Sequence, residues 1–125
     1  MSEERLIAIA AEDDRGLDAE VGAHFGRCPY YALVEANGGT VLGSRVVSNP
    51  YFDMPRPGVM PRFIRDIGAN VIIAGGMGPR AIEMFHGFGI DVATGVTGTV
   101  ATVLGALALL FVHLRGGPAK VDVSA

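Results

Sequence analysis

An imidazole, a guanidinium and a thiol lie within five residues of one another, in the segment His24-Phe25-Gly26-Arg27-Cys28. Imidazole nitrogen and thiolate sulfur are suitable ligands for iron, copper, zinc and metal sulfide clusters. The positive charge of Arg27 would favour the thiolate form of Cys28 and would attract an anion. His24 and Cys28 could therefore ligate a metal. The alternative, which the spacing alone favours, is that Cys28 is a small buried residue and His24 a hydrogen-bonded loop residue.

A second candidate site is the glycine-rich segment Gly75-Gly76-Met77-Gly78-Pro79-Arg80. Glycines after a strand let a ligand approach the backbone. A following helix presents free N–H groups and the positive end of its dipole to an anion. Arg80 would add a positive charge. Methionine usually fills a core, but the position of Met77 inside the turn makes its soft sulfur a candidate contact. The segment predicts either an anion-binding site or simply a tight turn.

The same turn formally matches the dinucleotide-binding fingerprint through Gly76, Gly78 and Ala81. The match is weak because the unit comes late in the chain and Asp91 follows too closely to be the acid that binds a ribose. A nucleotide-binding domain is therefore a third possibility only.

The sequence lacks the motifs of several classes of enzyme, which disfavours a catalytic function. Two-metal nucleases need carboxylates that converge on the strands, but the first predicted strand carries none and the fourth is purely apolar. The sequence has no nucleophile elbow, no HExxH motif and no P-loop. No nearby third group would orient a cysteine nucleophile. We therefore expect a protein that is not an enzyme, with a solvated acidic loop at Glu12, Asp13, Asp14 and Asp18.

The hydrophobic pattern predicts five strands and three helices in the order β-β-β-α-β-α-β-α. The strands are expected at residues 6–10, 30–34, 41–47, 71–74 and 90–94, and the helices at 59–67, 79–88 and 99–114. Asn37-Gly38-Gly39 predicts an antiparallel hairpin between the second and third strands. Right-handed crossovers then complete an α/β fold with a five-stranded mixed sheet and helices on both faces. Sites in such sheets form beyond the carboxyl ends of the strands, where the glycine-rich turn is expected.

Length and composition limit the class of protein further. A chain of 125 residues suits a single domain over 1–125, with a core over 5–114 and a mobile tail over 115–125. The 50% hydrophobic content excludes a disordered chain. A net charge of −3 disfavours duplex nucleic acid as a partner, because proteins that bind it are normally basic.

The single cysteine excludes an internal disulfide and a four-thiolate cluster, and it is typical of a reducing compartment. No signal peptide is visible at the N-terminus, so we expect a cytoplasmic protein. The continuous apolar stretch 100–112 is too short to span a membrane, and we expect no membrane association.

Five segments together resemble the dinitrogenase iron–molybdenum cofactor biosynthesis family. They occur in the same order and spacing and cover the chain from about Leu6 to Leu114. The two segments that contain His24-Phe25-Gly26-Arg27 and Ala74-Gly75-Gly76 are specific in combination, although either alone is weak. The five segments are Ile7–Ala10, His24–Tyr31, Ser48–Pro50, Val71–Ala81 and Gly98–Val100.

The resemblance implies a ribonuclease H-like fold without nuclease carboxylates, and it implies the binding and carriage of metal–sulfur clusters. Members handle the iron–molybdenum cofactor or its iron–sulfur precursor. A related member, the orange protein of anaerobic sulfate reducers, holds a molybdenum–copper sulfide cluster. This chain would then be a small chaperone or scaffold that passes a preformed cluster from a donor protein to an acceptor protein. The implied metal ligands are His24 and Cys28, and the residues expected to face the cluster are Arg27, Asn49, Gly76, Met77, Gly78 and Arg80.

Two stretches depart from the family pattern. Many members have a glycine- and histidine-rich segment after Asn-Pro, whereas residues 51–57 here read Tyr-Phe-Asp-Met-Pro-Arg-Pro. If this loop lines the cluster, the ligand set is different and more apolar.

The last predicted helix is also unusual, because small and apolar residues occupy positions that are charged in relatives. Ala101 and Gly105 are small residues at four-residue spacing, which allows close helix approach, and Leu109–Phe111 follow them. We expect a homo-oligomer through the helix 99–114, because so much exposed apolar surface is a liability in a monomer. The alternative function is a non-catalytic interaction or regulatory module that uses this helix.

Overall fold

The computed structural model describes residues 4–37, 40–54, 56–113 and 120–122. One mixed sheet has the strand order β3-β2-β1-β4-β5-β6. β2 is antiparallel to both of its neighbours, whereas β4, β5 and β6 continue the sheet in parallel from β1. The strands are β1 (Glu4–Ala11), β2 (Tyr30–Asn37), β3 (Thr40–Ser48), β4 (Val71–Ile73), β5 (Asp91–Thr94) and β6 (Lys120–Asp122).

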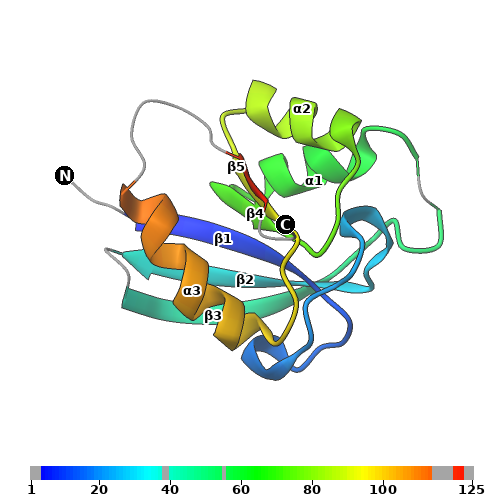
Figure 1. The fold of residues 1–125 in the computed structure, drawn as a ribbon. Helices are drawn as coiled ribbons and strands as arrows, with labels where there is room; N and C mark the ends of the chain where they lie inside the picture. Colours follow the sequence, from blue (N-terminus) through cyan, green and yellow to red (C-terminus); the bar gives the residue numbers. More distant parts are fainter. Residues whose placement is uncertain (1–3, 38–39, 55, 114–119, 123–125) are drawn as a thin grey trace.

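Helices cover both faces of the sheet (Figure 1). α1 (Val59–Asp66) and α2 (Pro79–Gly87) lie on one face, and α3 (Val100–His113) lies on the other. Two short 3₁₀ helices, η1 (Gly16–Asp18) and η2 (Phe25–Arg27), interrupt the long connection between β1 and β2. The α/β class, the mixed sheet and the antiparallel hairpin between β2 and β3 are thereby confirmed.

The hydrophobic core is divided by the sheet into two clusters. Ile7 and Ile9 of β1 belong to the cluster under α3, whereas Ala8 and Ala10 belong to the cluster under α1 and α2. Both faces of β1 are therefore buried, which explains its continuous apolar run. Ile64 and Phe85 anchor α1 and α2 in the second cluster with no exposed surface.

The predicted tail contains a strand that the hydrophobic pattern missed. The structure has the five expected strands and a sixth, β6, whose residues 120–122 pair in parallel with 92–94 of β5. Residues 120–122 of the predicted tail therefore form a strand of the sheet. Without β6, the backbone N–H and C=O groups along the edge of β5 would lack partners in the sheet. A short strand is enough to pair with them, and so short a strand gives no strong signal in the sequence. The rest of the predicted tail, together with Leu114, lies outside the described residues.

The sheet topology brings the candidate segments to one edge. β1, β4 and β5 are parallel, so their carboxyl ends meet there. The β1–β2 connection and the glycine-rich turn after β4 both leave the sheet at this edge. No helix among the described residues is long and apolar enough to cross a membrane.

Candidate functional site

The β1–β2 connection lies directly against the glycine-rich turn. The N–H of Gly75 donates to the carbonyl of Gly22 at 2.8 Å, and the N–H of Phe25 donates to the carbonyl of Gly76 at 2.9 Å. His24 and Met77 are each one residue away from the second of these bonds. Two segments some fifty positions apart in the chain are thus held together by main-chain hydrogen bonds.

Phe25 fixes the orientation of η2. Its ring is 5% exposed and packs edge-on against Phe85, with ring centroids 5.1 Å apart, and it also contacts Tyr31. Because Phe25 points into the core, the flanking His24 and Arg27 remain exposed at the surface. One buried aromatic anchor therefore presents an imidazole and a guanidinium on the same short segment.

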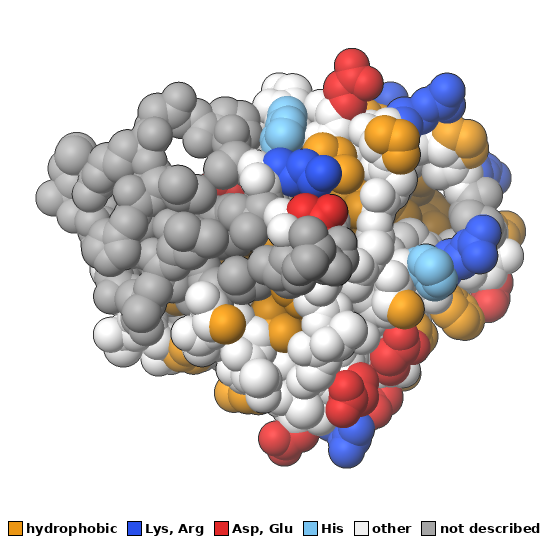
Figure 2. All heavy atoms as spheres, in the orientation of Figure 1, with side chains coloured by type: hydrophobic (Ala, Val, Ile, Leu, Met, Phe, Trp, Pro, Cys, Tyr) orange, Lys and Arg blue, Asp and Glu red, His pale blue; other side chains and the backbone are white. Residues whose placement is uncertain are grey.

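A cavity of about 480 Å³ opens between η2, the glycine-rich turn and the start of α1. Figure 2 shows this hollow on the right of the molecule, with hydrophobic side chains inside it and a histidine and basic side chains at its edge. Two of the lining residues are arginines and none is acidic. The lining residues are His24, Phe25, Gly26, Arg27, Arg56, Met60, Pro61, Gly76, Met77 and Gly78.

The chemistry of the cavity suits an anion with a soft surface. Arg27 and Arg56 supply positive charge, and Met60 and Met77 supply polarizable thioether sulfurs. Within the described residues, no hydrogen-bond acceptor is found for the N–H groups of Met77 and Gly78. α2 begins directly after this turn with Pro79 at its first position, so the positive end of its dipole is near the same place.

Five of the eight residues predicted for the site line this cavity: His24, Arg27, Gly76, Met77 and Gly78. The other three do not. Arg80 is exposed on the first turn of α2 and is absent from the lining.

Cys28 is in the core rather than at the cavity. Its side chain is 2% exposed, and its Sγ donates to the carbonyl of Phe25 at 3.4 Å. Burial raises the pKa of the Cys28 thiol above its ordinary value, so the thiolate that a metal would need is disfavoured. The chain packs closely around it: a Cβ on Gly22 would come within 2.9 Å of the Cβ of Cys28. Arg27 does not activate this thiol, and the structure favours the packing role for Cys28 over the ligand role.

The buried, protonated thiol predicts low reactivity. We expect native protein at pH 8 to resist alkylation of Cys28 by iodoacetamide, and unfolded protein to react fully, because only the exposed thiolate is nucleophilic. Intact-mass spectrometry with and without denaturant measures this. Fast alkylation of the native protein would contradict the buried position.

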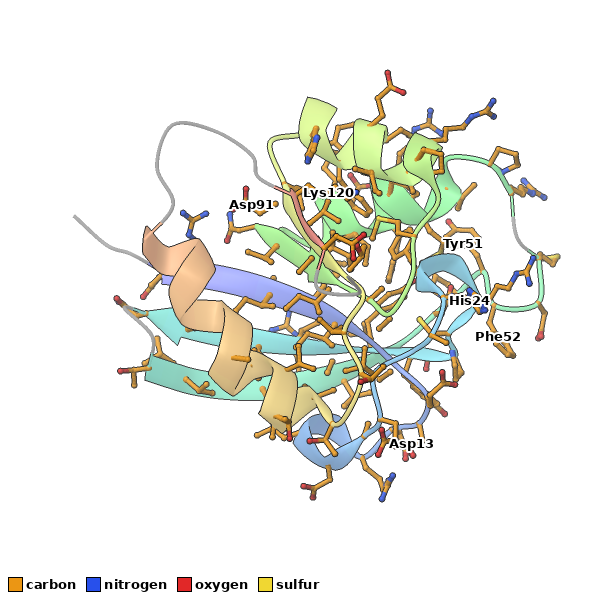
Figure 3. The ribbon with its side chains drawn as sticks, in the orientation of Figure 1. Asp13, His24, Tyr51, Phe52, Asp91 and Lys120 are labelled. Atoms are coloured by element: carbon orange, nitrogen blue, oxygen red, sulfur yellow. The ribbon has the colours of Figure 1, made fainter. Side chains whose placement is uncertain are left out.

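Asn49 also has a structural position. It is 6% exposed, its Nδ2 donates to the carbonyl of Cys28 at 2.8 Å, and its Oδ1 accepts from the N–H of Tyr51 at 2.8 Å. The first bond fastens the loop after β3 to the segment that carries His24, and the second is within the loop. Figure 3 shows His24 at the end of the molecule where Tyr51 and Phe52 of that loop also lie. Asn49 therefore supports the site without lining it.

Arg56, Met60 and Pro61 line the cavity, and sequence reasoning did not select them. Arg56 belongs to the loop whose departure from the family pattern was visible in the sequence. Met60 is 5% exposed on the buried face of α1, where its apolar position looks like ordinary core.

A model of the dinitrogenase iron–molybdenum cofactor family matches residues 5–109. The chain belongs to this family. The match spans β1 to the first part of α3 and therefore includes every residue that lines the cavity. The resemblance seen in the sequence is confirmed.

Individual relatives in the comparison agree with the family match. An uncharacterised protein of Methanocaldococcus jannaschii is 31% identical over 90 residues, which cover 70% of this chain and 74% of the relative. The crystal structure of the protein PH0822 matches with a TM-score of 0.74 and 39% identity, over 86% of this chain and 88% of that one. The apo form of the orange protein from Desulfovibrio gigas matches with a TM-score of 0.74 and 27% identity, over 91% and 95% of the two chains.

Proposed function

We propose that this protein binds a preformed anionic metal–sulfur cluster, of a molybdenum-containing or iron–sulfur type, and carries it as a small chaperone or scaffold. The observation that carries the proposal is the cavity at the strand ends, which has two arginines and two thioethers in its lining and no carboxylate. Membership of the dinitrogenase iron–molybdenum cofactor family supports this kind of cargo. The ribonuclease H-like classification, which the family implies, is part of the same proposal.

The residues at the cavity suit temporary holding. Among the described residues no group of three or more His, Cys, Asp and Glu side chains could hold a metal ion. The one cysteine is buried away from the cavity. A cluster would then be bound by charge, by N–H groups and by soft contacts, with His24 as the single imidazole available. Few covalent bonds to the protein would have to break when the cluster passes to an acceptor protein.

Each lining group has a distinct role in this proposal. Arg27 and Arg56 offset the negative charge of the cluster, and the N–H groups of Met77 and Gly78 donate to its sulfides. Met60 and Met77 contact the sulfides as soft, polarizable surfaces. Nothing in this set serves as a nucleophile with an orienting partner, so we propose a binding protein and not an enzyme.

Reconstitution tests the proposal. The protein is incubated without oxygen either with tetrathiomolybdate and copper or with iron and sulfide, and is then separated by gel filtration. We expect a visible chromophore to elute with the protein. Cys28→Ala should retain it, because that side chain does not reach the cavity, whereas His24→Ala should retain less. Absence of any protein-bound chromophore in both mixtures would refute the carrier role.

One observation on α3 favours a second candidate, an interaction module. Val100, Val103 and Leu104 pack against the sheet, while the small residues Ala101 and Gly105 are exposed on the same helix. We propose that this exposed strip contacts a second copy of the chain. The side chains beyond residue 106 of α3, including the apolar run 109–111, lie outside the described residues. Native mass spectrometry tests this contact. A dimer would support it, whereas a monomer that binds no cluster would favour a module whose exposed strip contacts a different protein.

A further inference from the structure

The segment 20–22 of the β1–β2 connection runs beside the end of β1 and is bonded to it through the main chain. The N–H of Glu12 donates to the carbonyl of Glu20 at 3.0 Å. The N–H of Gly22 donates to the carbonyl of Ala10 at 2.7 Å. Among the described residues this ladder of main-chain bonds stops there, and the N–H of the next residue has no main-chain acceptor.

A side chain supplies the missing acceptor. Oε1 of Glu12 accepts a hydrogen bond from the N–H of Ala23 at 3.1 Å. Ala23 is exposed, so burial of its own side chain does not hold it in place. Its backbone nevertheless has a tightly defined position, because its Cα lies 3.0 Å and its carbonyl oxygen 3.1 Å from where a Cβ on Gly75 would be. The carboxylate of Glu12 therefore extends the ladder by one residue, to the point where the connection meets the glycine-rich turn.

His24 lies between two anchored backbone groups. The N–H of Ala23 before it is bonded to Glu12, and the N–H of Phe25 after it is bonded to the carbonyl of Gly76. The imidazole itself is exposed and makes no hydrogen bond within the described residues, so its place at the cavity depends on these two neighbours. Only the first anchor is a side chain. Glu12 is absent from the cavity lining, so its negative charge holds the backbone without opposing the arginines there.

We propose that Glu12 is a positioning residue for His24: its carboxylate fixes the N–H of the preceding residue and thereby holds the imidazole at the cavity. The sequence predicts a solvated acidic loop that includes Glu12, whereas in the structure this carboxylate contacts the backbone beside the candidate site. The inference rests on the proposed function only where cargo is measured. The position of His24 can also be followed in protein that holds no cluster.

Amide hydrogen exchange and the NMR signals of the imidazole test the positioning without cargo. In Glu12→Ala the N–H of Ala23 should exchange about tenfold faster, the lower end of what a hydrogen bond to a charged acceptor contributes. The imidazole signals of His24 should shift in the same variant. Glu12→Gln should leave both readouts close to those of the natural protein, because its amide oxygen can accept the same bond.

The matched control is Asp14→Ala. Asp14 is an exposed carboxylate two residues further along the chain, and it is absent from the cavity lining. Its replacement removes the same charge as Glu12→Ala but no bond to Ala23, so both readouts should stay unchanged.

Chromophore retention after reconstitution tests whether Glu12 acts through His24. Glu12→Ala should retain less chromophore than the natural protein, and Glu12→Gln should retain nearly as much. In protein that already carries His24→Ala, adding Glu12→Ala should cause little further loss, because two residues that act through one contact have non-additive effects.

Unchanged imidazole signals of His24 in Glu12→Ala would overturn the inference, and so would an equal shift in Asp14→Ala. An additive loss of chromophore in the double variant would also overturn it, because Glu12 would then affect cargo independently of His24. Either result would leave the proposed function standing if the natural protein retains chromophore. If the natural protein retains none, the carrier role is refuted, whereas faster exchange and shifted signals in Glu12→Ala would still support the positioning of His24 by Glu12.

Discussion

Replacing Gly75 by alanine is expected to lower the free energy of unfolding by about 1–3 kcal/mol, the usual effect of forcing extra atoms into a well-packed place. A Cβ at this position would lie 3.0 Å from the Cα of Ala23 and 3.1 Å from the carbonyl oxygens of Gly22 and Ala23. All three neighbours are main-chain atoms, so a side-chain rotation cannot relieve the contact.

The same change should disturb the cavity. The N–H of Gly75 donates to the carbonyl of Gly22, and the carbonyl of Gly75 accepts from the N–H of Gly95, each at 2.8 Å. Gly75 thus connects the β1–β2 connection to the end of β5. Moving that connection separates His24 from Met77 and weakens the packing over Cys28. We therefore expect Gly75→Ala to retain less chromophore after reconstitution and to show faster alkylation of Cys28. Denaturant unfolding, gel filtration and intact-mass spectrometry measure the three effects.

Gly78→Ala is the matched control in the same turn. A Cβ on Gly78 would have no neighbour within 4 Å, and its φ of −69° suits any residue. Alanine is a poorer N-cap than glycine but reduces the entropy of the unfolded chain, so the two effects oppose each other and the net change should stay within about 0.5 kcal/mol. Equal stability of the two variants would contradict the close approach at Gly75.

The glycine-rich turn was selected from the sequence for a reason that explains only part of its structure. The sequence predicted glycines that let a ligand approach the backbone. In the structure Gly75 and Gly76 instead let the protein's own chain approach, because the backbone of Ala23 lies 3.0 Å from where each Cβ would be. The turn is still at the site, since Gly76, Met77 and Gly78 line the cavity. Sequence spacing identified the location, and only the fold could identify the neighbour.

The fold was predictable where hydrophobic periodicity was strong. β1 and β4 are apolar runs buried on both faces, and the hairpin of β2 and β3 follows from the Asn-Gly-Gly signal. β6 was not predictable, because its three residues contain a single apolar side chain and become a strand only by pairing with the edge of β5. Local sequence contains no signal for such a long-range pairing.

The cavity was only half predictable for a related reason. His24 and Arg27 are visible as a local constellation, but Arg56 and Met60 join them only because the fold brings the start of α1 to the same cavity. Cys28 was the most conspicuous candidate metal ligand in the sequence. In the structure, Phe25 and Cys28 of this segment are both buried, whereas His24 is exposed. Which side chains of a short segment face outward depends on the core beneath it.

Replacing both Arg27 and Arg56 by glutamine should weaken retention of tetrathiomolybdate by about 30-fold. Both arginines are exposed at the edge of the cavity. We therefore assign each contact with an anion about 1 kcal/mol, the upper end of the usual range for exposed ion pairs. Two such contacts sum to about 2 kcal/mol, and about 1.4 kcal/mol corresponds to tenfold in affinity. Equilibrium dialysis with absorbance of the bound anion measures the change.

Salt dependence separates this electrostatic contribution from loss of shape. Retention by the natural protein should fall as salt rises, because screening shortens the reach of exposed charges to about 8 Å at physiological ionic strength. Retention by the double variant should depend less on salt, since the charges that salt screens have been removed.

Arg45→Gln is the control for net charge. Arg45 is an exposed arginine on the edge strand β3, paired with Glu35 at 3.4 Å and absent from the cavity lining. Its loss removes one positive charge from the protein, as Arg27→Gln or Arg56→Gln alone does, but leaves the cavity intact, so retention should stay close to that of the natural protein. If Arg45→Gln weakened retention as much as either cavity variant alone, the anion would be attracted by the charge of the whole protein. The cavity would then not be its binding site. A loss confined to Arg27 and Arg56 would instead place the anion between η2 and the start of α1, in the cavity that both arginines line.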